Sequence, residues 1–298
     1  MGTDPTLRKI CLFGNFGAGN FGNECTLQAL LCNLRRYLPN AKISCICSGP
    51  EETASTYNVS AFPIRKMPLP RMNNGAMRMF RRIFIGIPIE LYRWFRAIAV
   101  LKGSDMLIMT GTGMLGDFGI LPLDLHYDIL RWSVMAKLCR CKLLFVSVGA
   151  GPIRHPLSRR FVKAALTLAN YRSYRDSFSK EYLKSIGFER KGDTVYPDLA
   201  FSLPRAIIPG NHHRDDQGAV VGVGLMTYFN KLATSENDET IYRDYLTKVA
   251  AFVNWLLDHN YTVRLLIGDA VYDKRVREDL GELLKGVTST DRVRKIID

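Results

Sequence analysis

Residues 9–48, KICLFGNFGAGNFGNECTLQALLCNLRRYLPNAKISCICS, contain the pattern that decides the fold. A continuous apolar run leads into a glycine-rich turn, the turn leads into a segment with its leucines on one helical stripe, and a second apolar run follows. Apolar runs that do not alternate with polar residues are typical of strands covered on both faces. The order strand, turn, helix, strand predicts the first unit of a parallel, doubly wound α/β sheet.

The same alternation continues along the chain. The apolar runs SDMLIMTG, KLLFVSVGA and DTVYPDLAF predict further strands, and the segments between them have helical patterns, at residues 122–140, 158–170 and 177–186. A stretch rich in Pro, Gly, His and Asp then marks a linker. We expect a first domain at residues 1–205, a linker at 206–217 and a thin second domain at 218–298.

Within the thin second domain, AVVGVGLM and TVRLLIGD predict two strands, followed by helices at residues 239–259 and 272–286. Two clear strands are few for an α/β domain. We therefore expect a second domain that is partial.

The composition favours a globular protein of a reducing compartment. The chain has 298 residues, of which 47% are hydrophobic and 23% are charged. Its seven cysteines lack histidines at zinc spacing, which predicts free thiols in a cytoplasmic protein. We expect neither a signal peptide nor a membrane span, because charged or turn-forming residues interrupt every long apolar run.

The positive charge is concentrated in one segment. The formal net charge is +13, and residues 65–102 hold nine basic side chains against one acid, Glu90. Apolar and basic residues lie on separate stripes over residues 75–102, as in a basic amphipathic helix. This insertion predicts docking on an anionic membrane surface, and an ordinary solvated helix face is the other interpretation. The cations expected to face the membrane are Arg78, Arg81, Arg82, Arg93 and Arg96.

Three glycine-rich turns follow predicted strands. Because the carboxyl ends of parallel strands meet at one edge of a sheet, we expect the turns to bind an anionic ligand there. The first turn has the GxGxxG spacing of dinucleotide sites, but the next strand ends without the acid that binds a ribose, which disfavours NAD. A tight turn without a ligand is the other interpretation. The expected binding residues are Gly17, Gly19, Asn20, Gly22, Asn23, Glu24, Gly111, Thr112, Gly113, Asp117, Gly149, Gly151 and Arg175.

Charged residues follow at the same expected edge. Arg175 begins a helix after a short strand, and its planar guanidinium suits a carboxylate or phosphate, although a structural pair with Asp176 is the alternative. The candidate acids and bases are His155, Asp176 and Asp198. Because the sequence lacks zinc-protease, nucleophilic-serine and Walker motifs, we expect no metal.

Five motifs, taken in order, resemble the pattern of the polysaccharide pyruvyl transferase family. They are AGNFGNE (18–24), GTGMLGD (111–117), GAGPI (149–153), RDSFSKEYLKSIG (175–187) and PDLAF (197–201). The resemblance implies two Rossmann-like domains that face a cleft, similar to two-domain glycosyltransferases. It also implies transfer of a pyruvyl group from phosphoenolpyruvate onto a sugar of a cell-surface or exopolysaccharide precursor, as a ketal. Phosphoenolpyruvate is then the donor substrate, and no cofactor is expected.

The sequence departs from the family pattern at two places. Asn23 stands where the pattern has an Asp, which puts an acid–base role there in doubt. No Arg-x-His element follows residue 220, which raises the expectation of a truncated chain that is inactive alone. The membrane hypothesis implies a lipid-linked acceptor and a peripheral location at the inner face of the cell membrane.

Two other functions compete with pyruvyl transfer. The first is a nucleotide-sugar-dependent glycosyltransferase of the same fold. The second is a non-enzymatic basic module that binds nucleic acid through aromatic residues interleaved with arginines, such as Tyr92, Trp94 and Phe95. We favour pyruvyl transfer over both, and nucleic acid is the less favoured partner.

Overall fold

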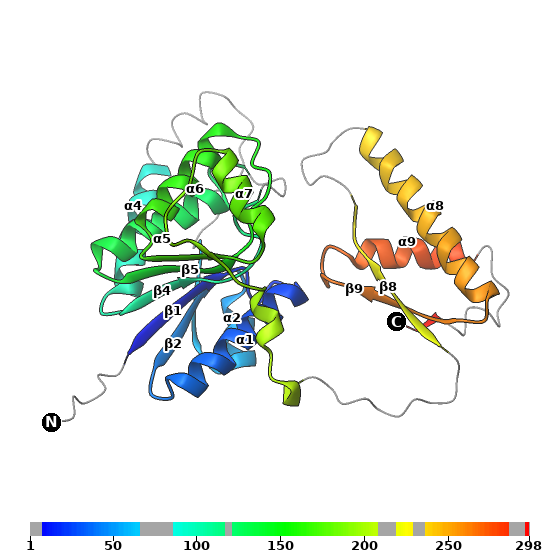
Figure 1. The fold of residues 1–298 in the computed structure, drawn as a ribbon, viewed down its shortest axis with the longest axis horizontal. Coiled ribbons are helices and arrows are strands. Elements are labelled where there is room, and N and C mark those ends of the chain that lie inside the picture. The colour runs from blue at the N-terminus through cyan, green and yellow to red at the C-terminus, as the bar shows by residue number, and fades with distance from the viewer. Residues whose placement is uncertain are drawn as a thin grey trace. The chain divides into compact units, whose positions relative to one another are not determined.

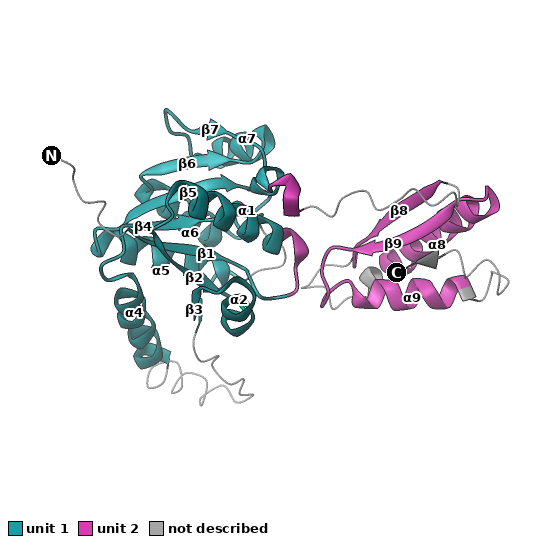
Figure 2. Ribbon diagram, turned by 90° about the horizontal axis from the view of Figure 1, so that it is seen from below, with its two compact units in different colours: residues 1–18, 23–203 teal, residues 19–22, 204–298 magenta. Residues whose placement is uncertain are grey.

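The chain forms two compact units, each with its own parallel sheet (Figure 2). The computed structural model describes residues 8–65, 86–116, 121–207, 219–228, 236–285 and 296–297. The first unit comprises residues 1–18 and 23–203, and the second comprises residues 19–22 and 204–298. Residues 208–217 of the expected linker lie outside the described residues.

The first unit contains a seven-stranded parallel sheet in the order β3-β2-β1-β4-β5-β6-β7. The chain moves outward from β1 to β3, returns beside β1 as β4, and moves outward again on the other side. The strand order therefore reverses between β1 and β4, as in a doubly wound Rossmann-like sheet. The strands are β1 (Lys9–Gly14), β2 (Lys42–Cys47), β3 (Ser60–Pro63), β4 (Met106–Met109), β5 (Lys142–Val148), β6 (Tyr171–Tyr174) and β7 (Thr194–Val195).

Helices cover both faces of this sheet (Figure 1). On one face, Leu27 and Leu31 of a helix pack in one cluster with Ile10 and Leu12 of β1. On the other, Phe13 of β1 shares a cluster with residues of four further helices. Burial on both faces explains why the β1 run is continuously apolar. The helices are α1 (Phe21–Tyr37) and α2 (Pro50–Tyr57) on the first face, and α4 (Ile87–Leu101), α5 (Leu125–Leu138), α6 (Pro156–Leu168) and α7 (Ser177–Ser185) on the second.

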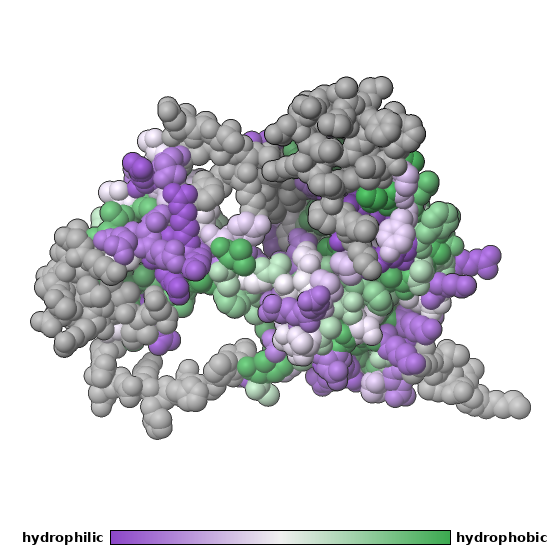
Figure 3. Space-filling model, turned by 180° about the vertical axis from the view of Figure 1, so that it is seen from behind, coloured by the Kyte–Doolittle hydropathy of each residue, from purple (hydrophilic) through white to green (hydrophobic). Residues whose placement is uncertain are grey.

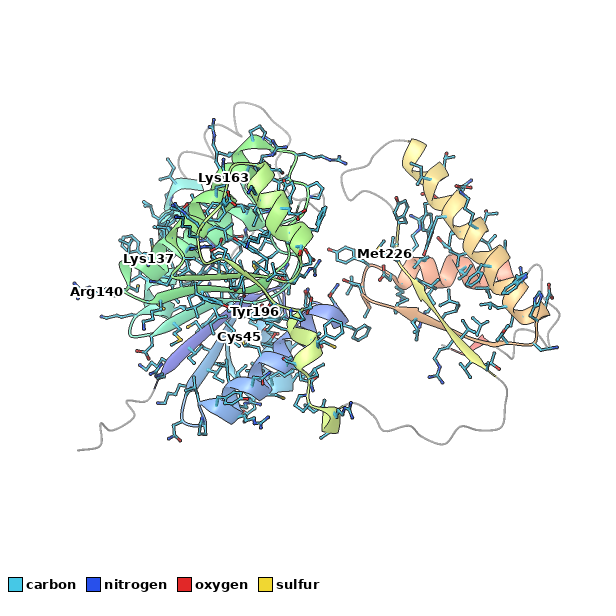
Figure 4. The ribbon with its side chains drawn as sticks, viewed as in Figure 1. Cys45, Lys137, Arg140, Lys163, Tyr196 and Met226 are labelled. Carbon is cyan, nitrogen blue, oxygen red and sulfur yellow. The ribbon has the colours of Figure 1, made fainter. Side chains whose placement is uncertain are left out.

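The seven cysteines are free thiols, as the sequence predicts. Cys45 on β2 is fully buried in the layer beneath α1 (Figure 4). Burial, with smaller contributions from the neighbouring thiols of Cys47 and Cys11, raises the pKa of Cys45 to about 12. A thiol with so high a pKa carries almost no thiolate at neutral pH, so Cys45 is a packing residue.

The second unit contains a three-stranded parallel sheet in the order β10-β9-β8. Its core is formed by apolar residues of both helices and two strands, among them Val253, Val263, Leu265, Val276 and Leu280. The elements are β8 (Val220–Leu225), α8 (Glu236–Asp258), β9 (Thr262–Ile267), α9 (Lys274–Lys285) and β10 (Ile296–Ile297). The strand–helix alternation predicted for this part of the chain is confirmed.

In the described part of the chain, no helix combines the length and the apolar content needed to cross a membrane.

The basic amphipathic insertion was expected to present its arginines to a membrane, and the described part of it does not do so. Arg78, Arg81 and Arg82 lie outside the described residues, and the remaining part is α4. The Arg93 side chain is only 12% exposed, and its Nη1 lies 3.1 Å from Glu90 Oε2. Arg96 Nη1 donates to the Pro63 carbonyl at 3.2 Å. The arginines of α4 are therefore engaged by the protein, because acidic and carbonyl partners lie beneath the helix.

A buried charge network lies between α4 and α5. Arg131 of α5 is 1% exposed, and its guanidinium lies 3.2 Å from Glu90 and 2.8 Å from Asp128. Its Nη2 also donates to the Ile64 carbonyl at 3.0 Å. Arg65 pairs with the same Asp128 and lies 2.8 Å from Asp124. The network connects the end of β3 to both helices.

Candidate functional site

The three glycine-rich turns follow three neighbouring strands. β1, β4 and β5 are adjacent in the sheet, and the strand order reverses between β1 and β4. In open α/β sheets, ligands bind outside the carboxyl ends of the strands at such a reversal. Residues 111–113 and 149–151 come directly after two of these strands, and residues 15–18 follow the third. The convergence that the sequence predicts is therefore present in the first unit.

Gly17 shapes the first turn through a close backbone contact. Its φ is +68°, and a Cβ there would lie 2.1 Å from the carbonyl oxygen of Gly49. The Gly17 N–H donates to Glu24 Oε1 at 2.7 Å, and the Tyr57 hydroxyl donates to Glu24 Oε2 at 2.9 Å. Burial, followed by this bond to Glu24, raises the Tyr57 pKa. Because the Gly17 N–H and Glu24 are both used in holding the turn, they have a structural role.

The other residues of the first motif also make protein contacts. Asn23 Nδ2 donates to the Asn15 carbonyl at 3.2 Å. Residues 19–22 group with the second unit, where the Ala270 N–H donates to the Gly19 carbonyl at 2.8 Å and Asn20 Nδ2 donates to Asp269 Oδ2 at 3.2 Å. Gly22 lies at the second position of α1. The structure thus divides the first motif between the two units.

The second and third turns are joined by backbone hydrogen bonds. The Gly149 N–H donates to the Thr112 carbonyl at 3.0 Å, and the Leu115 N–H donates to the Gly149 carbonyl at 3.2 Å. Gly111 packs so closely that a Cβ there would lie 2.5 Å from the carbonyl oxygen of Ser147. Gly113 accepts a hydrogen bond from the Gly116 N–H at 3.2 Å, and Asp117 lies outside the described residues. These contacts hold the second and third turns together.

Arg175 lies directly over the third turn. A Cβ on Gly149 would be 2.6 Å from Arg175 Nε, so glycine lets the guanidinium lie against the backbone in this position. Arg175 Nε lies 3.4 Å from Asp176 Oδ2, and Arg175 Nη1 lies 3.6 Å from Asp198 Oδ2. The Arg175 side chain remains 37% exposed. The structure therefore brings Gly149, Arg175, Asp176 and Asp198 together at the carboxyl edge of the sheet.

The two carboxylates of this cluster are also helix caps. Asp176 accepts from the Ser179 N–H at 2.6 Å, at the start of α7. Desolvation opposes the charged form of Asp176, but hydrogen bonds from Ser179 and the charge of Arg175 outweigh it and hold its pKa below the usual range. Asp198 Oδ1 accepts from the Ala200 N–H at 3.0 Å. Asp176 is thus an anion at neutral pH, and Asp198 presents its second oxygen to Arg175.

His155 is the exposed N-cap residue of α6, four positions after Gly151. Its Nδ1 accepts from the Leu157 N–H at 3.1 Å. In the neutral ring this bond leaves the proton on Nε2. Among the described residues, no group of three or more His, Cys, Asp or Glu side chains is placed to hold a metal ion.

Sequence reasoning missed two serines that shape the third turn. Ser179 Oγ accepts from the Ala150 N–H at 2.9 Å. The RDSFS motif therefore has two roles, because Asp176 caps α7 and Ser179 holds the third turn. Ser147 has φ +48°, and the pairing of β5 with β6 shifts register between Phe145 and Val148. The Ser147 N–H donates to Ser173 Oγ at 2.8 Å. A bulge of this kind redirects the strand just before the turn.

We expect Ser147→Gly to keep or raise the stability of the fold, because glycine adopts a positive φ without steric cost. Ser147→Val is expected to lower the free energy of unfolding by about 1–3 kcal/mol, since a β-branched side chain is strained there. Urea unfolding of both variants measures this difference. A glycine variant less stable than the valine variant would contradict a strained bulge.

The order of the sheet and the turns at its reversal place the protein among α/β proteins with a Rossmann-like core. A family model for polysaccharide pyruvyl transferase matches residues 20–298, so the chain belongs to this family and is a transferase. None of the curated proteins compared with the chain matches it.

Solved structures share the fold at low identity. A Listeria monocytogenes protein assigned as a UDP-N-acetylglucosamine 2-epimerase is 10% identical, with a TM-score of 0.56 over 98% of this chain and 68% of that one. S. aureus MnaA, solved with UDP, is 12% identical with a TM-score of 0.54 over 98% and 68%. The UDP-GlcNAc 2-epimerase of Methanocaldococcus jannaschii is 12% identical with a TM-score of 0.52 over 98% and 72%. The predicted class, two Rossmann-like α/β domains, is confirmed.

Proposed function

We propose that the protein transfers a pyruvyl group from phosphoenolpyruvate to two hydroxyls of a sugar, forming a ketal. The observation that carries this proposal is the half-exposed Arg175, which lies over Gly149 between two carboxylates at the sheet edge. A planar guanidinium that is partly exposed to solvent suits the donor's carboxylate. Family membership supports the same reaction.

The donor also carries a phosphate, which needs hydrogen-bond donors of its own. The N–H groups of Gly17 and Gly149 are used within the protein, at 2.7 and 3.0 Å. Arg175 is therefore the anion-binding group that we assign to the donor.

The reaction requires one proton donor and one base. Protonation of the donor's methylene carbon leaves positive charge on the central carbon, which the first sugar hydroxyl attacks as it gives up its proton. The second hydroxyl then displaces inorganic phosphate, and its proton leaves with the phosphate. We assign the base to Asp198, because hydrogen bonds from Ser179 and the charge of Arg175 hold the pKa of Asp176 below its usual range and make Asp176 a weak base. We assign the acid to His155 through Nε2, since Nδ1 is occupied.

Family membership supports a saccharide acceptor. The proposed acceptor is a precursor of a cell-surface polymer. We also propose that the enzyme acts in the cytoplasm and that its acceptor is linked to a lipid. Nucleic-acid binding is disfavoured, because the arginines interleaved with the aromatic residues of α4 are engaged within the protein: Arg93 pairs with Glu90 and Arg96 donates to the Pro63 carbonyl.

Titration calorimetry of the full chain with phosphoenolpyruvate and with UDP distinguishes the proposal from a nucleotide-sugar transferase. We expect phosphoenolpyruvate to bind with a dissociation constant below about 1 mM, and UDP to bind at least tenfold more weakly. UDP is the matched control because structural neighbours were solved with it. Binding of UDP alone would refute pyruvyl transfer, and mass analysis of the product would then show a hexose in place of a pyruvyl group.

A further inference from the structure

The outward face of α4 is apolar along most of its length. Ile87, Leu91, Tyr92 and Phe95 are 53%, 54%, 47% and 67% exposed. At 100° per residue, these four side chains lie within one face of the helix. We name these four residues the α4 stripe. Viewed from behind, hydrophobic side chains reach the surface of the first unit on the side where α4 lies (Figure 3). A contiguous apolar face on a surface helix marks an interaction site.

The charges of α4 are all turned away from this stripe. Glu90 accepts from the Tyr127 hydroxyl at 2.8 Å and pairs with Arg93 and Arg131. Desolvation opposes the ionised form of Glu90, but these bonds outweigh it and lower its pKa. Arg96 donates to the Pro63 carbonyl. Covering the α4 stripe therefore removes apolar surface from water without desolvating a charge, which is the favourable case for burial.

The sequence beside the stripe indicates which partner covers it. Residues 66–85 carry five cations and no acid: Lys66, Arg71, Arg78, Arg81 and Arg82. These cations come directly before α4 in the sequence. The partner must then accept aromatic and aliphatic side chains next to a cluster of positive charge. The interface of an anionic lipid bilayer has both properties.

We propose that the α4 stripe docks in the interfacial region of an anionic membrane, with apolar contact as the main source of affinity. Tyr92 and Phe95 are side chains of the kind that lie at the level of lipid headgroups. The apolar stripe replaces the arginine face that the sequence predicts as the docking surface. This inference does not depend on the identity of the donor substrate.

Vesicle flotation of the full chain tests the proposal, with vesicles of phosphatidylcholine alone and of phosphatidylcholine mixed with phosphatidylglycerol. We expect the protein to float with the mixed vesicles. Leu91→Gln with Phe95→Gln should weaken binding at least about tenfold, because two exposed apolar side chains are lost. The control is Tyr37→Gln, which removes a 70% exposed aromatic from α1 on the opposite face of the sheet and should bind as the unmodified chain does.

Three outcomes would overturn the proposal. The chain could fail to float with either vesicle. The double variant could float as well as Tyr37→Gln, which would assign binding to charge alone. Analytical ultracentrifugation could show a dimer that Leu91→Gln with Phe95→Gln dissociates, which would make the α4 stripe an interface between two copies. Glutamine is chosen because it adds no charge and leaves the long-range attraction to anionic lipid unchanged.

Discussion

Replacing Arg175 by alanine is expected to weaken binding of phosphoenolpyruvate by about 10- to 100-fold. A hydrogen bond to a charged group contributes about 1.5–3 kcal/mol, and about 1.4 kcal/mol corresponds to a factor of ten. Titration calorimetry gives the dissociation constant directly. Arg175→Lys should recover only part of the loss, because lysine keeps the charge but lacks the planar fork. A dissociation constant within threefold of that of the unmodified chain would remove Arg175 from the donor site.

The Arg175 variant should fold normally. The ion pairs of Arg175 are long, at 3.4 and 3.6 Å, and all three side chains are partly exposed, so their loss costs little stability. Lys184→Ala on α7 is the matched control, since it removes an exposed cation that pairs with Glu189 at 2.9 Å. Gly149→Ala should reproduce the Arg175 effect, because a Cβ would occupy the position of the guanidinium. A Gly149→Ala protein with full affinity would show that the position of Arg175 does not matter.

The sequence was sufficient to predict where the candidate site lies. Apolar runs without alternation identified β1, β4 and β5, and the rule for parallel sheets placed their turns at one edge. The same rule placed Arg175 and Asp176 there, after β6, with Asp198 following β7. These predictions depend only on strand direction and local order, which a sequence pattern carries.

Contacts between distant residues could not be predicted in this way. Gly17 is required because its backbone meets that of Gly49, whereas glycine at position 149 leaves space for the Arg175 side chain in its present position. Nothing in the local sequence pattern indicates either contact. From the sequence alone, these glycines could therefore be interpreted only as residues of a ligand-binding turn. The positive φ of Ser147 gives no signal at all, because serine is common in strands and turns alike. Close approaches of this kind are properties of the packed structure.

The orientation of α4 was wrong in the sequence prediction for a related reason. Periodicity shows that a helix has an apolar and a basic stripe, but it does not show which stripe faces the protein. The arginines of α4 face inward because Glu90 of the same helix and the Pro63 carbonyl at the end of β3 provide their partners. Arg131 of the neighbouring helix α5 also pairs with Glu90. Whether an arginine faces inward can therefore be predicted only when the elements that pack against its helix are known.

Replacing Arg131 by methionine is expected to lower the free energy of unfolding by about 3–5 kcal/mol at pH 8. Arg131 is 1% exposed and pairs with Glu90 and Asp128, and removing one partner from a buried network leaves the others uncompensated. Urea unfolding measures the loss. Arg243→Met is the matched control, because Arg243 is 77% exposed and lies 3.7 Å from Glu239, and it should change stability by no more than about 0.5 kcal/mol.

The loss in Arg131→Met should shrink as the pH falls from 8 to 5. Burial raises the pKa of Asp128 to about 6, against the lowering effects of Arg131 and Arg65, so removal of Arg131 raises it further. A carboxyl group with a raised pKa in the folded state adds stability that is complete below its unfolded pKa and is lost as pH rises through its folded pKa. Glu90 loses a stabilising cation as well, which raises its pKa in the same direction. The variant therefore gains stability relative to the unmodified chain on acidification, as Asp128 takes up a proton. A loss that is equal or larger at pH 5 would show that Arg131 acts through packing rather than charge.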